Sequence, residues 1–135
     1  MLFLVLYYDA GGIMKSITPN LKVTDIPNSL IFYETILGFK IIMKVPDENP
    51  VWVMLKNGNA EIMLQQKESI EEEYPTLKEK ESGALTFYTI VEDSEVFYEK
   101  IKNNVNIVHH LHVTPYGRKE FSVTDPDGFI FTFAS

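Results

Sequence analysis

Residues 32–36 read Phe-Tyr-Glu-Thr-Ile, and residues 97–101 read Phe-Tyr-Glu-Lys-Ile, about half a chain length later. A second pair of similar segments follows the first. Asn57-Gly58 precedes an apolar, strand-like run, and Asp127-Gly128 precedes another. Self-similarity at a fixed spacing is the signature of a repeated supersecondary unit. The chain of 135 residues is therefore expected to contain two copies of one module.

Each copy predicts a strand, a helix and then three further strands. In the first copy, Asp25 can accept backbone N–H bonds at the helix start, and Gly38 can take the left-handed conformation that ends the helix. Asn57-Gly58 is a strong hairpin signal because both residues tolerate positive φ. The second copy has Asp93 as its helix cap. Strands are expected at 21–23, 39–45, 51–56 and 60–66, and again at 85–91, 106–113, 118–124 and 129–134.

The domain boundaries follow from where patterned sequence begins and where it changes character. Residues 1–13 are expected to be a leader or a disordered N-terminal extension, because patterned sequence begins at Met14. One domain then spans 14–135, which suits the usual domain size. Module one covers about 15–67, an acidic connector about 68–82, and module two about 83–135.

Composition excludes several classes of function. The chain has 12 Lys plus Arg against 19 Asp plus Glu, a net charge of −7, so a nucleic-acid phosphate backbone is an unfavourable partner. The apolar run at residues 1–8 is too short to span a membrane, and no membrane partner is expected. The chain has no cysteine, which excludes disulfides, thiolate metal sites and thiol nucleophiles. The absence of cysteine also fits a reducing compartment, and we expect a cytoplasmic protein.

Four short motifs occur in a specific order and spacing. They are Asn-Leu-Lys-Val-Thr-Asp at 20–25, Phe-Tyr at 32–33, Leu-Gly-Phe at 37–39, and Thr-Asp-Pro-Asp-Gly at 124–128. With these motifs the chain resembles the glyoxalase/bleomycin-resistance/extradiol-dioxygenase group, also called the vicinal oxygen chelate superfamily, over roughly residues 15–135. The resemblance implies an α+β fold of two tandem βαβββ modules, whose curved sheets enclose a cavity. It also implies a homodimer with a small-molecule ligand inside the cavity.

The same resemblance implies four positions that supply metal ligands in the enzymes of the group, in the first and last strands of each module. The ligands there are usually His, Gln or Glu. The matching residues in this sequence are Thr18, Met63, Thr86 and Thr132. A threonine hydroxyl is a weak neutral donor, and a thioether is too soft for Mg, Mn or Zn. A shift of one residue brings in only aliphatic residues, proline or phenylalanine. We therefore expect no metal and no other cofactor.

Strand alternation predicts which side chains line the cavity. We expect Met63 to oppose Trp52 across the hairpin, Glu61 to oppose Met54, and Phe121 to oppose Thr132. Trp52 and Tyr88 can stack on a ring or a cation, or they can simply fill the core or a dimer contact. Lys22 can pair with a ligand carboxylate or phosphate. The candidate ligand-binding residues are Asn20, Lys22, Trp52, Met54, Glu61, Met63, Thr86, Tyr88, Phe121 and Thr132.

Two further groups of polar residues favour a structural role. His110 and His112 are expected to share one face of a strand near His109, where a metal would still need a third ligand, so surface histidines are the preferred interpretation. Asp125 and Asp127 resemble a carboxylate pair, but their place beside Pro126 and Gly128 predicts a turn.

The leading functional hypothesis is a metal-free small-molecule-binding protein without catalytic residues, whose ligand is a partly planar, amphipathic organic compound. The alternative is a metal-dependent lyase, isomerase or dioxygenase of the same superfamily, similar to lactoylglutathione lyase. A metal-free enzyme with Glu61 or a histidine as general base, and a structural dimer with a filled cavity, are the remaining possibilities.

Overall fold

The computed structural model describes residues 12–135, so the leader predicted at 1–13 lies almost entirely outside the described residues. Two four-stranded sheets, each with one parallel and two antiparallel pairings, form two tandem modules. This confirms the predicted α+β fold. Sheet 1 has the order β1-β4-β3-β2, with β1 at Asn20–Val23, β2 at Lys40–Val45, β3 at Trp52–Asn57 and β4 at Ala60–Gln66. Sheet 2 has the order β5-β8-β7-β6, with β5 at Thr86–Ile90, β6 at Asn106–Val113, β7 at Lys119–Thr124 and β8 at Ile130–Ala134.

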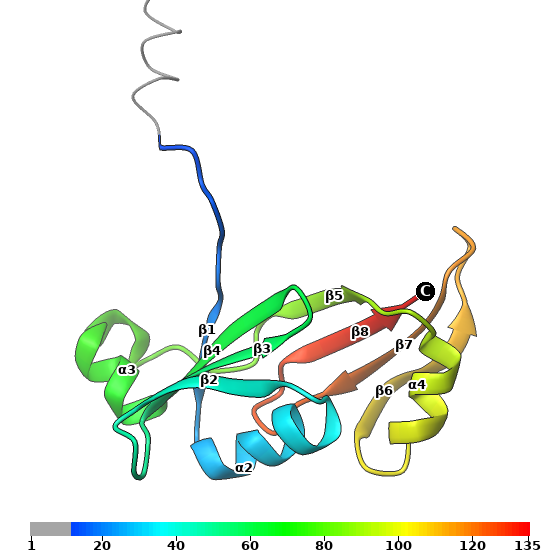
Figure 1. Ribbon diagram of the computed structural model, residues 1–135. Helices are drawn as coiled ribbons and strands as arrows, with labels where there is room; N and C mark the ends of the chain where they lie inside the picture. Colours follow the sequence, from blue (N-terminus) through cyan, green and yellow to red (C-terminus); the bar gives the residue numbers. More distant parts are fainter. Residues whose placement is uncertain (1–11) are drawn as a thin grey trace, which may run out of the picture.

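Helix α2 lies below β2 in Figure 1, and α4 lies at the right beside β6. Module one contains α2 at Ile26–Leu30, which continues as the π-helix η1 at Ile31–Ile36, and module two contains α4 at Ser94–Ile101. The connector holds helix α3 at Lys67–Glu73 and the short 3-10 helix η2 at Pro75–Leu77. Within residues 12–135, no helix has the length and apolar character needed to cross a membrane.

The first helix starts and ends differently from its counterpart in module two. Asp25 occupies the N-cap position in an extended conformation, but its side chain makes no capping bond, so that part of the prediction is wrong. The π-turn places the adjacent residues Phe32 and Tyr33 both in the buried interior. Gly38 follows the helix at φ +82°, the left-handed conformation that was predicted to end it.

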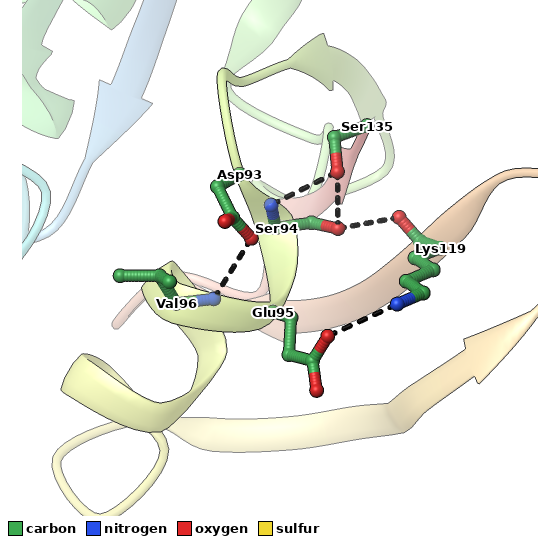
Figure 2. A network of polar contacts seen from close by, with 6 residues as sticks. All are labelled: Asp93, Ser94, Glu95, Val96, Lys119 and Ser135. Atoms are coloured by element: carbon green, nitrogen blue, oxygen red, sulfur yellow. Dashed lines mark hydrogen bonds and ion pairs between the residues drawn. The ribbon is translucent and has the colours of Figure 1, made fainter.

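Helix α4 is fixed at its start by a polar network (Figure 2). Asp93 accepts a capping bond from the backbone N–H of Val96 at 3.1 Å, as predicted. The fully buried Ser94 donates its hydroxyl to the carbonyl of Lys119 at 2.7 Å, and its N–H donates to Ser135 at 3.0 Å. These bonds attach the helix start to β7 and to the residue that follows β8.

One hydrophobic core serves both modules. Phe32 and Tyr33 of the first helix contact Phe131 of β8, with ring centroids 6.1 and 5.7 Å apart. On the other side, Phe97 of α4 meets Phe133 edge-on at 4.9 Å. The core therefore lies between the helices and the helix-facing sides of the two sheets.

Polar bonds to the turn before β8 join the two modules. The buried hydroxyl of Tyr33 donates to Asp125 at 2.6 Å, and the other oxygen of Asp125 accepts backbone N–H bonds from Asp127 and Phe129 at 2.9 and 2.8 Å. Thr24 donates its N–H and its hydroxyl to Asp127 at 3.0 and 2.7 Å. Both aspartates thus act in the turn, as predicted, and the turn binds module two to module one.

Gly83 passes against this turn from the connector side. It has a φ of +82°, and a Cβ built on it would collide with the carbonyl oxygen of Asp127. Gly117, in the turn between β6 and β7, has a similar φ of +85° but nothing within 4 Å of such a Cβ. The two glycines therefore carry the same backbone strain on substitution, and only Gly83 adds a collision with a backbone atom.

We predict that Gly83→Ala destabilises the protein by about 1–3 kcal/mol more than Gly117→Ala, because overpacking adds to the shared strain of a positive φ. Urea denaturation of the two variants measures this difference. Equal free energies of unfolding would show that the connector does not pack closely on the turn.

The bond between Tyr33 and Asp125 predicts a pH dependence of stability. Burial, and then the neighbouring Asp125 carboxylate, raise the pKa of the Tyr33 hydroxyl far above its ordinary value of 10.0. The stabilisation is therefore complete below pH 10 and is lost as the pH rises above it, since the unfolded chain releases a proton that the folded chain keeps. Above pH 10, the free energy of unfolding falls by at most about 1.4 kcal/mol per pH unit through this group. We expect Tyr33→Phe to be less stable than wild type at pH 7 by about 1.5–3 kcal/mol, and to lose this part of the alkaline slope. Denaturation midpoints between pH 8 and 11 test this, and parallel profiles for the two proteins would contradict it.

Candidate functional site

Each sheet has one face that is not packed on α2 or α4, and we call it the open face. On sheet 1 the rows that cross this face are Asn20–Met63–Met54–Met43 and Lys22–Gln65–Trp52–Val45. On sheet 2 they are Tyr88–Thr132–Ser122–His109 and Ile90–Ala134–Glu120–His112. The intervening residues of the inner strands, such as Leu64 and Phe131, lie in the core. The open faces therefore carry the side chains that remain available for function.

The hairpin between β3 and β4 has a different register from the predicted one. Its closing pair is Asn57 with Ala60, so the turn residues are Gly58 and Asn59 instead of Asn57 and Gly58. Trp52 consequently opposes Gln65, while Met63 opposes Met54. The predicted partners are wrong by two residues. A shift of two keeps every side chain on its predicted face.

The hairpin between β7 and β8 has an error of one residue, which reverses faces. The N–H of Asp125 donates to the carbonyl of Phe129 at 2.9 Å, so three residues form the turn. Ser122 therefore opposes Thr132, and Phe121 opposes Phe133 in the core. Phe121 is fully buried and packs on Phe97, so its assignment to the cavity lining is wrong. Ser122 and Glu120 take its place on the open face.

Sheet 1 presents an apolar patch, which we define as Met43, Val45, Trp52, Met54 and Met63. Trp52, Met54 and Met63 are half-buried, and the side chains of Met43 and Val45 are more than half exposed. The pairing of β2 with β3 shifts between Ile41 and Met43, and this irregularity brings Met43 and Val45 to the open face. Strict alternation would have placed both with Ile41 on the core side, and for that reason sequence reasoning missed them.

Lys22 holds the connector against the end of sheet 1. Its ammonium group donates to the carbonyls of Leu77 and Lys80 at 2.8 and 2.9 Å, and it pairs with the carboxylate of Glu71. The hydrogen bond and the charge of Lys22 lower the pKa of Glu71. An anionic ligand at Lys22 would have to displace these three oxygen atoms.

Amide side chains continue this arrangement. Asn20 donates to the side-chain oxygen of Gln65 at 2.7 Å, and the amide nitrogen of Gln65 donates to Ser69 and Glu73 of α3. Helix α3 is thus bonded to the open face of sheet 1 at its polar end. Glu61 lies further along β4 and pairs with Lys56 at 3.7 Å.

Sheet 2 carries a buried carboxylate between two phenols, which we call the phenol–carboxylate cluster: Tyr88, Tyr116 and Glu120. Tyr88 of β5 donates to Glu120 at 2.9 Å, and Tyr116 of the β6–β7 turn donates to both carboxylate oxygens at 3.0 Å. Desolvation of the hydroxyl, together with the hydrogen bond to Glu120, raises the pKa of Tyr88 to about 12, so this group remains a donor at neutral pH. Thr86 and Thr132 lie on the same face, and Thr132 shares a hydrogen bond of 2.7 Å with Ser122.

The three histidines separate between the two faces of β6. The pairing with β7 shifts between His109 and His112, which brings these two residues to the open face opposite Ser122 and Glu120. His110 instead meets the hydroxyl of Tyr98 on α4 at 2.7 Å. The prediction that His110 and His112 share a face is therefore wrong. Among residues 12–135, no three side chains of His, Asp or Glu are grouped as a metal site.

Comparisons with known proteins agree with this architecture. The family model for a glyoxalase-like domain matches residues 16–135. The chain belongs to the glyoxalase-like domain family. Among curated proteins, none matches the sequence of this glyoxalase-like domain.

Solved structures similar to this glyoxalase-like domain cover nearly the whole chain. A glyoxalase/bleomycin resistance protein/dioxygenase from Nocardioides has a TM-score of 0.77 at 18% identity and covers 98% of this chain and 91% of its own. A protein of unknown function from Agrobacterium tumefaciens has a TM-score of 0.76 at 23% identity, and the match covers 93% of this chain and 96% of that protein. The hypothetical protein SA1046 from S. aureus has a TM-score of 0.73 at 25% identity, and the match covers 96% of this chain and 98% of that protein. These structures share the fold.

The residues at the four metal-ligand positions of the superfamily do not fit a divalent ion. Met63 lies between Asn20 and Met54 and offers a thioether. The hydroxyl of Thr132 is already bonded to Ser122, and Thr18 and Thr86 offer only neutral hydroxyls. Divalent ions such as Mg and Mn prefer carboxylate oxygens, and Zn prefers imidazole or thiolate. The side chains at these four positions therefore do not supply the donor atoms that such ions prefer.

Proposed function

We propose that this glyoxalase-like domain is a metal-free small-molecule-binding protein that holds a partly planar, amphipathic organic compound on its open faces. The apolar patch of sheet 1 carries this proposal, because it leaves an indole and three thioethers at least partly exposed in the structure of residues 12–135. Exposed apolar patches with a polar surround mark binding sites. Trp52 offers a flat ring surface, and methionine side chains adapt to ligands of irregular shape.

Polar groups around the patch would orient the compound. Binding sites combine an apolar lining with a few placed polar groups. Of the predicted ligand-binding residues, we retain those whose side chains lie on the open faces or at their rim: Asn20, Trp52, Met54, Glu61, Met63, Thr86, Tyr88 and Thr132. We assign Lys22 a positioning role, since its ammonium group holds the connector that borders the site.

We further propose that a second copy of the chain completes the site. On the open face of sheet 2 Tyr88 is more than half exposed, and edge strand β2 adds the exposed residues Ile42, Met43 and Val45. Uncovered apolar edges favour association with another chain. A homodimer in the cytoplasm is the arrangement we expect.

Trp52 gives this proposal a built-in reporter, because it is the single tryptophan of the chain. Suitable probes are three planar compounds of different charge: proflavine, a cation; 1-anilinonaphthalene-8-sulfonate, an anion; and 1-naphthalenemethanol, which is neutral. We predict that at least one of them changes Trp52 fluorescence saturably. A probe at 100 times its Kd should also add about 2.7 kcal/mol of stability.

The matched variants for this experiment are Met63→Ala and Met14→Ala. Met63 lies in the apolar patch, whereas Met14 precedes β1 and is 83% exposed. We expect only Met63→Ala to weaken binding. If none of the three probes changes Trp52 fluorescence, or if both variants bind with the affinity of wild type, the proposed function is contradicted.

A further inference from the structure

Glu120 is a buried acid on a face where a ligand is proposed to bind. It is 9% exposed, although it lies on β7 between the open-face neighbours His112 and Ala134. No Lys, Arg or His side chain forms an ion pair with it among residues 12–135, and residues 1–11 contain none of these residue types. A desolvated carboxylate without a counter-charge is unfavourable. Among the described residues, this acid therefore has no cationic side chain as its partner.

The neighbouring basic side chains are directed elsewhere. Lys119, next in sequence, pairs with Glu95 at 3.0 Å (Figure 2). His112 opposes Glu120 in the strand pairing, but its Nδ1 atom contacts the carbonyl of His110 at 2.8 Å. Neither of these basic side chains is therefore an ion-pair partner of Glu120.

The two tyrosines fix the carboxylate and leave part of it free. A carboxylate has about four acceptor positions, and each phenol supplies one hydrogen. Tyr88 and Tyr116 together therefore fill two positions at most and leave two for another donor. They approach from β5 and from the β6–β7 turn, so the carboxylate is held from two separate elements.

The rings of both tyrosines remain accessible. Tyr88 is 54% exposed and Tyr116 is 66% exposed, although their hydroxyl groups are bound to Glu120. Aromatic faces attract cations, and this attraction adds to that of a nearby carboxylate. An anionic group at the same place would be repelled.

We infer that the phenol–carboxylate cluster of Tyr88, Tyr116 and Glu120 is the receptor for a positively charged group on the ligand, an ammonium or a guanidinium. This inference rests on the proposed function and specifies its ligand class. The cationic group occupies the free positions of Glu120 between the two rings, and the planar body of the compound lies on the remaining open face. Ser122 and Thr132, which neighbour the cluster, offer hydroxyl groups to polar substituents.

Calorimetric titration of the full-length chain with proflavine and with 1-naphthalenemethanol tests this inference. The variant is Glu120→Gln, and the matched control is Glu95→Gln, which changes the net charge equally at an exposed site. We expect Glu120→Gln to weaken proflavine binding about 10- to 100-fold, the range of a lost charged hydrogen bond. The affinity for 1-naphthalenemethanol should change less than about 2-fold, and Glu95→Gln should affect neither probe.

A second variant keeps the test decisive if Glu120→Gln does not fold, as judged by circular dichroism. Tyr116→Leu removes an exposed ring, and we expect it to weaken proflavine binding about 2- to 5-fold while leaving the neutral probe unaffected. Equal effects of Glu120→Gln and Glu95→Gln, or binding of a neutral or anionic probe in preference to proflavine, would overturn the inference and leave the proposed function intact. If no probe changes Trp52 fluorescence, both the inference and the proposed function are overturned.

Discussion

The buried hydrogen bond from Tyr33 to Asp125 is the constraint on which the arrangement of the two modules depends. It joins the helix of module one to the turn of module two, inside a core that both modules share. The same turn accepts bonds from Thr24, and Gly83 passes close against it. Because α2 and α4 face this common core, neither of these helices packs on the opposite faces of the two sheets. The proposed binding site is a consequence of that division between a packed face and an open face.

The fold could be predicted from the sequence because its signals are local. The repeat of Phe-Tyr-Glu, the left-handed Gly38 and the aspartates of the last turn each specify an element or its end. Register was harder to predict, since one extra turn residue reverses the faces of a strand. That error assigned Phe121 to the open face and left Glu120 out of the candidate site. The irregular pairings of β2 and β6 also lie within runs where apolar residues or histidines follow one another, so the sequence pattern does not reveal them.

The candidate site combines two chemically different surfaces. Sheet 1 supplies the indole and thioether groups, and sheet 2 supplies hydroxyls and the carboxylate of Glu120. The apolar part was largely visible in the sequence, because a register error of two residues preserves faces. Lys22 could not be interpreted from sequence alone, because its partners Glu71, Leu77 and Lys80 come from a connector whose path is set by tertiary packing. This division of chemistry suits an amphipathic ligand with one charged end.

We propose that the open faces capture organic molecules without a divalent metal. The most direct test of this proposal is equilibrium dialysis of the full-length protein against Zn, Mn, Ni and Fe(II), followed by elemental analysis of the bound metal. We expect far less than one bound ion per chain for every metal, and no rise in the midpoint of thermal unfolding. One ion per chain, lost when Met63 or Thr132 is replaced by alanine, would contradict it.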